Sequence, residues 1–231
     1  MLNSISNELK VLANPQKAKV LANFFKTGKD EYGEGDVFLG ITVPELRQVA
    51  RKHSNLSLSE IRKLLCSPIH EERLASLLVL VSKYESADPV AKEEIFDFYI
   101  DNAKSVNNWD LADLSAAKIA GNYLLDKDKA VLYRLAKSKS LWERRIAIIS
   151  TYEFIRNNQF EDTFKIAGLL LSDRHDLIHK AVGWMLREVG KRDRLAEEKF
   201  LKKHAVEMPR TMLRYAVERF SSEKKRRYMA L

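Results

Sequence analysis

Helix-start signals recur about every 12 to 20 residues along the whole chain. Three of them are capping boxes, in which a serine or threonine stands three positions before a glutamate: 42–45, 57–60 and 140–143. Two more place proline directly after Asn14 or Asp88, an arrangement that favours a first helical turn. Apolar residues follow these signals at helical spacing, so the sequence predicts an all-α fold.

The predicted helices are short and closely connected. They span residues 4–13, 15–27, 43–53, 57–66, 69–86, 88–103, 109–123, 127–138, 141–157, 159–171, 174–190, 193–206, 210–220 and 222–229. Successive pairs recur at about 35 to 45 residues, the period of HEAT-type repeats, although no motif repeats letter for letter. Short helices with short connections can form a globular bundle or stacked helical pairs, and this period favours the second. The sequence therefore predicts one domain over residues 1–231, an α-solenoid of HEAT-like helical pairs with a concave inner face. The apolar run 145–155 is expected to form an inner helix.

One stretch departs from the helical pattern. Residues 28–40 hold four of the eight glycines, and Val37, Leu39 and Ile41 alternate with their neighbours as they would in a strand. The pattern predicts a short β-hairpin or an ordered loop over residues 28–42, placed to reach a bound ligand.

Charge and composition limit the class of partner. The net charge is +8, and residues 174–231 carry all of the excess, with 16 Lys and Arg against 8 Asp and Glu. This asymmetry favours a polyanion partner, nucleic acid before an acidic membrane, although a basic surface can also serve solubility alone. Cys66 is the only cysteine, and the sequence shows neither a secretory signal nor an apolar run long enough for a bilayer. A cytoplasmic, membrane-free protein is expected.

Trp109 and Asp113 form the first candidate site. They lie four residues apart, so both project from one face of the predicted helix, beside the small residues Ala112, Ala116 and Ala117. Small neighbours are expected to leave room for a ligand to approach the indole and the carboxylate. The alternative is a core tryptophan with a surface aspartate.

Trp184 marks a second candidate site. Lys180, Arg187 and Lys191 share its face of the predicted helix, opposite the apolar stripe that faces the core. Cations interleaved with an indole suit a sugar–phosphate strand, because the cations neutralise phosphates while the ring packs on sugar or base. The alternative is an indole packed on a neighbouring helix with cationic side chains extending around it.

Further arginines extend this basic character. Arg210 and Arg214 share a helix face, and both are expected to contact a polyanion. Arg144 and Arg145 lie near a helix N-terminus, where the macrodipole disfavours cations. One of these two is therefore expected to face a carboxylate or a phosphate.

No metal or cofactor is expected. His175 and His179 have the spacing of a zinc helix, but no third ligand follows them. The sequence has no phosphate-binding loop, no nucleophile elbow and no dinucleotide fingerprint. Asp113 is the one acid expected beside both an aromatic ring and open space. A single carboxylate suits a reaction whose leaving group needs no proton, because it can stabilise positive charge or orient water.

Several of these segments together resemble the AlkD-like family of HEAT-like-repeat DNA alkylation-repair proteins, over roughly residues 15–220. The resemblance lies in 38–45, 109–113, 141–145 and 179–188. It implies a right-handed α-solenoid that binds double-stranded DNA in a concave, basic face. Active relatives are monofunctional glycosylases that release N3- and N7-alkylated purines without metal or cofactor. This chain is expected to act as a monomer.

The resemblance also implies residue roles. Trp109 and Trp184 would flank the deoxyribose of the damaged nucleotide, Asp113 would stabilise the oxocarbenium-like sugar and position water, and Arg145 would hold a phosphate. Tyr32, in the glycine-rich stretch, is counted among the expected DNA contacts.

Two departures keep a second function open. Asn108 stands where active relatives can carry another tryptophan, and residues 28–36 look like an insertion. Members with such a hairpin resemble a subfamily that lacks glycosylase activity and binds branched DNA. The sequence thus predicts an alkylpurine DNA glycosylase, with a catalytically silent binder of branched or distorted DNA as the alternative. A HEAT-like scaffold for acidic proteins is a third, weaker hypothesis.

Overall fold

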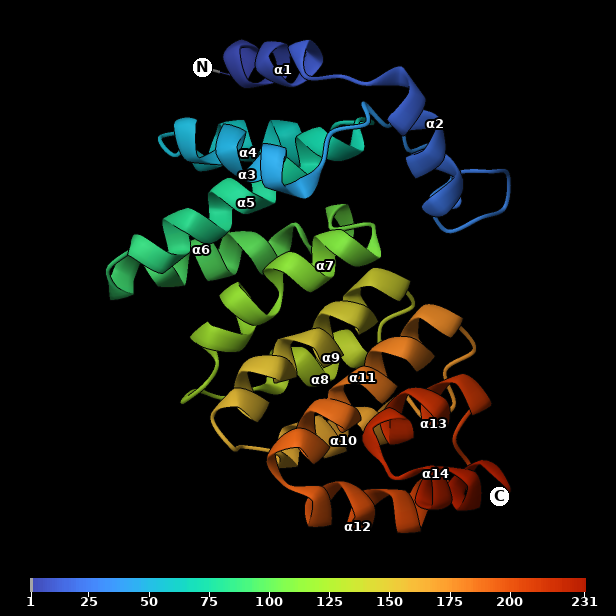
Figure 1. Cartoon of the computed structure of the whole chain (residues 1–231). Helices are drawn as coiled ribbons and strands as arrows, with labels where there is room; N and C mark the ends of the chain where they lie inside the picture. The colour runs from blue at the N-terminus through green and yellow to red at the C-terminus, as the bar shows by residue number, and fades with distance from the viewer. Residues whose placement is uncertain (1) are drawn as a thin grey trace. The chain divides into compact units, whose positions relative to one another are not determined.

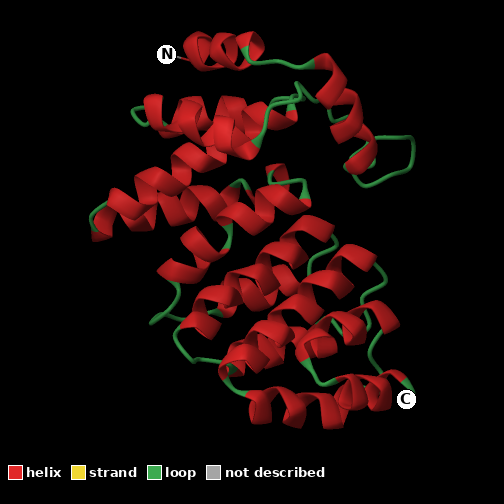
Figure 2. Cartoon of the chain, in the orientation of Figure 1, coloured by secondary structure: helices red, strands yellow, loops and turns green. Residues whose placement is uncertain are grey.

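The structure, a computed structural model, describes the backbone of residues 2–231 and the side chains from Ser4 onward. Its regular elements are all helical within that range, which confirms the predicted all-α fold (Figure 2). The chain divides into two compact units, Met1–Ser115 and Ala116–Leu231, here called the N-terminal and C-terminal units. A single domain over residues 1–231 stays a prediction.

The N-terminal unit contains seven α-helices and a 3-10 turn, η1 (Ala103–Ser105). The helices are α1 (Leu2–Val11), α2 (Pro15–Phe24), α3 (Val43–Lys52), α4 (Leu58–Leu65), α5 (His70–Ser86), α6 (Pro89–Asp101) and α7 (Trp109–Ser115) (Figure 1). Helices α3, α4, α6 and α7 all pack on α5. Every residue of α5 from His70 to Val81 is buried, so α5 is the central helix of this unit.

Local signals fix where these helices begin. The Ser57 hydroxyl accepts a hydrogen bond from the Glu60 backbone while the Glu60 carboxylate bonds back to Ser57, as the capping-box pattern predicts. The same reciprocal pair joins Thr42 and Glu45. Each such cap contributes about 1 kcal/mol to helix stability. The predicted starts of α3 and α4 are therefore confirmed.

The predicted β-hairpin does not form, and the ordered-loop alternative is correct. Residues 25–42 run as turns, with one isolated bridge in which His70 N donates to Val37 O at 2.9 Å. The carboxylate of Glu71 accepts hydrogen bonds from the backbone N–H groups of 39, 40 and 41. A side chain of α5 thus takes the bonds that a partner strand would have made, which explains why the alternating pattern gave no hairpin.

The C-terminal unit opens with a π-helical segment, η2 (Ala117–Gly121), which interrupts the helix predicted over 109–123. It continues with α8 (Ala130–Ala136), α9 (Leu141–Arg156), α10 (Glu161–Leu169), α11 (Asp176–Arg192), α12 (Arg194–His204), α13 (Arg210–Ala216), the 3-10 turn η3 (Val217–Arg219) and α14 (Ser222–Met229).

Helices α9 and α11 form the centre of the C-terminal unit. Helix α9 packs against η2, α8, α10 and α11, and it is buried from Arg145 to Thr151, as expected for an inner helix. Helix α11 packs against α9, α10, α12 and α13. Gly183 permits the close approach of α11 and α13, because a Cβ there would lie 2.4 Å from the Met212 carbonyl oxygen. Within each unit, successive helices thus stack as pairs, in the manner of an α-solenoid.

Candidate functional site

Trp109 begins α7 and is half-buried against aromatic rings. Its indole stacks on Phe25 with centroids 5.0 Å apart and an angle of 13°, and it meets Phe24 edge-on at 5.9 Å. Its backbone N–H donates to the Asn108 side-chain oxygen at 2.8 Å. The ring is therefore held on one face while part of its surface stays accessible.

The residues that flank Trp109 point into a buried polar network. His70 Nε2 lies 2.8 Å from Asp110 Oδ2, and His70 Nδ1 lies 3.4 Å from Asp36 Oδ2. Asp36 also pairs with Arg73 at 2.7 Å and accepts from Asn108 Nδ2 at 3.2 Å. These contacts tie the glycine-rich loop, through Asp36, to α5 and to both neighbours of Trp109.

The charges of this network stabilise one another. Burial alone would lower the pKa of His70, but hydrogen bonds to Asp110 and Asp36 outweigh burial and raise it. Burial would likewise raise the pKa of Asp36, but bonding to His70 and the charge of Arg73 lower it. The arrangement favours an imidazolium held between two carboxylates.

Asp113 lies one turn after Trp109 on α7 and is half-buried. The small residues beside it do not border open space, contrary to expectation: Ala112, Ala116 and Ala117 are all buried. The Ala116 carbonyl oxygen lies 3.4 Å from Ser150 Oγ of α9, so small side chains here serve close helix packing. A ligand can therefore reach Asp113 only through the exposed part of its own side chain, and the alanines leave no open space beside it.

Trp184 is half-buried on α11. Its indole N–H donates to Glu188 Oε1 at 3.0 Å, and its ring lies 6.2 Å from the ring of Tyr152 on α9. The packing on a neighbouring helix corresponds to the alternative considered for this residue, but part of the ring remains exposed. Glu188 was not anticipated, although its spacing of four residues from Trp184 was visible in the sequence.

The three cations around Trp184 are each paired with a carboxylate. Lys191 Nζ lies 2.6 Å from Glu188 Oε1, and Lys180 Nζ lies 2.6 Å from Asp176 Oδ2. Arg187 pairs with Glu218 of η3. The Lys180–Asp176 pair is exposed, and pairs of this kind contribute only about 0 to 1 kcal/mol, so Lys180 can exchange its carboxylate for a phosphate at small cost. Glu188 is buried, so Lys191 is held more firmly.

Arg144 and Arg145 occupy different environments at the start of α9. Arg144 Nε donates to Asp173 Oδ2 at 2.6 Å, so one of the pair does face a carboxylate. Arg145 is buried, and its Nη1 donates to the Leu177 carbonyl oxygen at 2.6 Å. In this arrangement Arg145 joins α9 to the start of α11.

The remaining predicted contacts lie at exposed or half-buried positions. Arg210 begins α13 and donates to the Met229 carbonyl oxygen, and Arg214 lies one turn later; both are exposed. Tyr32 is half-buried in the loop of the N-terminal unit, and its hydroxyl lies 3.5 Å from the Phe24 carbonyl oxygen. Each of these roles stays a prediction.

The histidine pair has structural uses at the start of α11. His175 Nδ1 caps the helix by accepting from Leu177 N at 3.1 Å, and His179 Nε2 lies 2.5 Å from the Asp173 carbonyl oxygen. Throughout the described residues, no group of His, Cys, Asp and Glu side chains could hold a metal ion.

Each unit thus assembles part of the predicted residue set. Trp109 and Asp113 lie together in the N-terminal unit, and Trp184 lies with Arg187 and Lys191 in the C-terminal unit. Sequence reasoning missed the network around His70, because Asp36, His70 and Asp110 are separated by 34 and 40 positions.

Comparisons with known proteins agree on one family. A sequence model of the family described as DNA alkylation repair enzyme matches residues 5–220. A solved structure, the predicted DNA alkylation repair enzyme from Enterococcus faecalis, superposes with a TM-score of 0.68 at 15% identity, covering 91% of this chain and 97% of that one. At that identity the superposition shows a shared fold. No curated protein matches the chain.

Proposed function

The chain belongs to the DNA alkylation repair enzyme family, and we propose that it hydrolyses the N-glycosidic bond of cationic N3- or N7-alkylpurines in double-stranded DNA. The observation that carries this proposal is the pairing of Trp109 and Asp113. They lie one turn apart on α7, both half-buried, with the indole fixed by its stack on Phe25. An accessible carboxylate beside an immobilised ring suits a deoxyribose that develops positive charge.

The chemistry needs few protein groups. An alkylated purine is cationic, so it leaves as a neutral base when the N-glycosidic bond breaks, and no general acid is required. The sugar becomes oxocarbenium-like, and a nearby carboxylate, Asp113, stabilises that charge and orients water. The water oxygen bonds to the anomeric carbon, and its proton passes to Asp113 or to solvent. An indole face such as that of Trp109 stabilises a cationic sugar further.

The cations of the C-terminal unit would hold the DNA backbone. Arg187 and Lys191 lie beside Trp184, with Lys180, Arg144, Arg145, Arg210 and Arg214 as the other predicted contacts. Each phosphate that a cation neutralises steepens the salt dependence, by about 0.9 in the slope of log affinity against log salt. In this proposal the protein acts on alkylated DNA as a cytoplasmic monomer, and the reaction needs no metal or cofactor. No helix in the described range is long and apolar enough to cross a membrane.

A base-release assay tests this function. We expect N7-methylguanine to be released from methylated duplex DNA, with Asp113→Asn losing most of the rate while the protein stays folded. Asp110→Asn would not be a matched control, because Asp110 lies in the buried network. Asp97→Asn is suitable, since Asp97 is an exposed aspartate of α6 in the same unit. Absence of base release by the wild type at high protein concentration would exclude a glycosylase.

One observation favours the second candidate, a catalytically silent binder of branched DNA. Asn108, which stands where active relatives can have a tryptophan, is fully buried and bonded to Asp36, so it adds no aromatic surface beside Trp109. This candidate predicts tighter binding to a four-way junction than to linear duplex, lost on deleting residues 29–36. Equal affinities for junction and duplex would count against it.

A further inference from the structure

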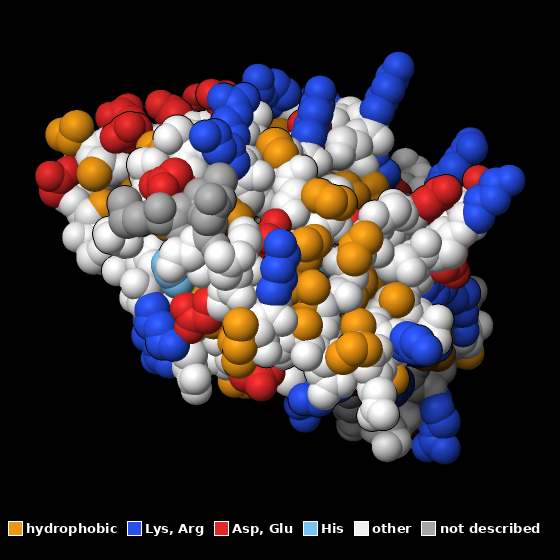
Figure 3. Space-filling view, turned by 90° about the horizontal axis from the view of Figure 1, so that it is seen from above, with side chains coloured by type: hydrophobic (Ala, Val, Ile, Leu, Met, Phe, Trp, Pro, Cys, Tyr) orange, Lys and Arg blue, Asp and Glu red, His pale blue; other side chains and the backbone are white. Residues whose placement is uncertain are grey.

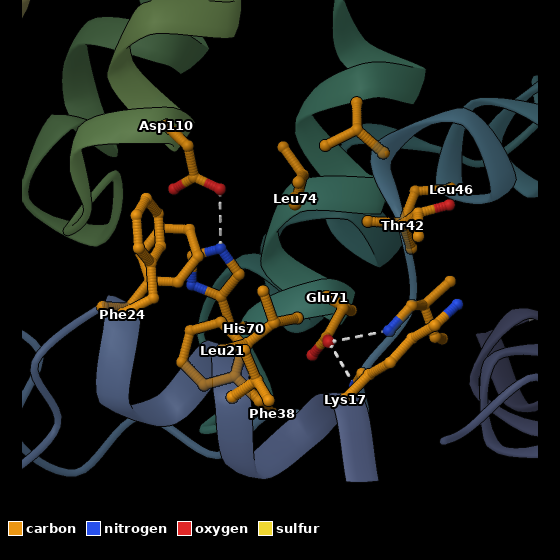
Figure 4. A pocket seen from close by; sticks show the side chains of 15 residues that line it. Lys17, Leu21, Phe24, Phe38, Thr42, Leu46, His70, Glu71, Leu74 and Asp110 are labelled. Carbon is orange, nitrogen blue, oxygen red and sulfur yellow. Dashed lines mark hydrogen bonds and ion pairs between the residues drawn. The ribbon is translucent and has the colours of Figure 1, made fainter. Parts of the chain in front are cut away.

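A pocket of about 390 Å³ lies in the N-terminal unit between α2, the following loop, α3 and α5 (Figure 4). Its apolar walls come from Leu21, Phe24, Ile41, Leu46 and Leu74. Pockets of about 300 to 1,000 Å³ typically hold small ligands or the anchoring side chains of a partner. Trp109 and Asp113 do not line the pocket, although two of its lining residues, Phe24 and Phe25, contact the Trp109 ring.

The polar groups at the base of the pocket are already bonded. Both oxygens of Glu71 accept from loop N–H groups, the shortest at 2.8 Å from Gly40 N. His70 faces Asp110 at 2.8 Å on one side and Asp36 on the other. A polar ligand that entered the pocket would lose hydrogen bonds to water and gain few in return. The pocket therefore suits apolar groups.

The rim of the pocket is an exposed apolar surface. No residue of α2 is buried, and the α2 residues that line the pocket, Lys17, Val20, Leu21 and Phe24, follow the spacing of one helix face. Val20 is 67% exposed and Phe24 62%. Val11, at the end of α1, is 84% exposed. In Figure 3, hydrophobic side chains gather in the middle of the face seen from the α1 side, with Lys and Arg and some Asp and Glu side chains around them.

The segment that includes α2 is basic. Residues 9–29 contain five lysines and no Asp or Glu. All five are exposed: Lys10, Lys17, Lys19, Lys26 and Lys29. Lys17 lines the pocket, and Glu45 of α3 is the acidic residue that interacts with its charge. An apolar pocket beside this basic helix complements a partner that carries apolar side chains among carboxylates.

We propose that this surface is a docking site for an acidic amphipathic segment of another protein, whose apolar side chains enter the pocket while its carboxylates face the lysines. A helical segment with apolar residues at i, i+3 or i+4, and i+7 has the geometry for such a groove. Duplex DNA could pair its phosphates with the lysines, but it brings no apolar side chains to fill the pocket. A lipid surface also fits poorly, since Leu46 and Leu74 line a concave pocket and do not protrude. The proposal does not depend on glycosylase activity.

Selection from a displayed library of random 16-residue peptides on the full chain tests the docking site. We expect enriched peptides to combine helically spaced Leu, Ile, Phe or Trp with Asp and Glu. A synthetic copy of the best peptide should bind at least tenfold more weakly to Val20→Glu and to Lys17→Glu. Val90→Glu, at a 79% exposed position on α6 of the same unit, should bind as the wild type does.

The controls separate the possible occupants. Both substituted α2 positions are exposed, so the variants should keep the wild-type unfolding temperature. Enriched peptides that bind Val20→Glu and wild type equally, or a library without enrichment, would overturn the proposal. Binding of phosphatidylserine vesicles or of a 16-base-pair duplex that is lost in Val20→Glu, with no loss of peptide binding, would reassign the surface to that ligand.

Discussion

Glu197→Gln removes a fully buried carboxyl group from the C-terminal unit. Glu197 lies on α12 with 0% exposure, beneath Gly190, where a Cβ would lie 1.6 Å from Glu197 Oε2. Arg194 Nη1 lies 3.0 Å from the same oxygen. Burial raises the pKa of Glu197 to about 8, although the nearby Arg194 charge acts in the opposite direction.

The expected effect follows from proton linkage. The folded state binds this proton up to about pH 8, whereas the unfolded state releases it near the ordinary value of 4.5. Between these values the folded state holds more protons, so the free energy of unfolding falls by about 1.4 kcal/mol per pH unit as pH rises. From pH 5 to pH 7.5 the loss is about 3 kcal/mol. Glutamine does not titrate, so the variant should lack this part of the decline.

Urea unfolding of wild type and Glu197→Gln at several pH values between about 5 and 8 measures this difference. Glu161→Gln is the control in the same unit. Glu161 is exposed, and its pKa is lowered, chiefly by a hydrogen bond from Lys165, so it is ionised in both states across the interval. Equal slopes of unfolding free energy against pH in wild type and Glu197→Gln would refute the reasoning.

Three further predictions concern the site and the helix packing. Asp113→Asn should slow base release at least a hundredfold without changing the unfolding temperature, as measured by release of methylated base; an unchanged rate would remove Asp113 from the chemistry. Gly183→Ala should lower the free energy of unfolding by about 1 to 3 kcal/mol, because the added Cβ would lie 2.4 Å from the Met212 carbonyl oxygen. Gly168→Ala, where no atom lies near the added Cβ, should raise it by about 0.5 to 1 kcal/mol. Thermal unfolding measures both. Asp36→Asn should lower the pKa of His70, measured by NMR titration, because the hydrogen bond to Asp36 helps to raise it. The stability that the protonated His70 contributes is fully present below its ordinary pKa, and it is lost as pH rises through the raised pKa.

The helical fold was predictable because its signals are local. The capping box at Ser57 and Glu60 lies within a single turn, and so do the asparagine cap and proline that begin α2. Such contacts depend on neighbours three positions away and therefore appear in the sequence itself. The missing hairpin has the opposite cause, because Glu71 bonds to loop residues about 30 positions earlier.

In the candidate site, too, contacts within one helix were predictable and contacts between distant elements were not. The pairing of Trp109 with Asp113 follows from helical spacing, and the structure places both on α7. Glu188 could have been anticipated from its position one turn after Trp184. The stack of Trp109 on Phe25 joins residues 84 positions apart on different elements, and no local pattern indicates it.

The three bonds between Glu71 and the loop backbone have a practical consequence. They hold the chain at 39–41, after the loop, while the fully buried side chains of Ile5 and Leu9 on α1 hold it before the loop. A protease cut between residues 28 and 35 would therefore sever the polypeptide without releasing either fragment. The nicked protein should co-elute as one species until urea separates the pieces, and the same segment should accept an inserted tag.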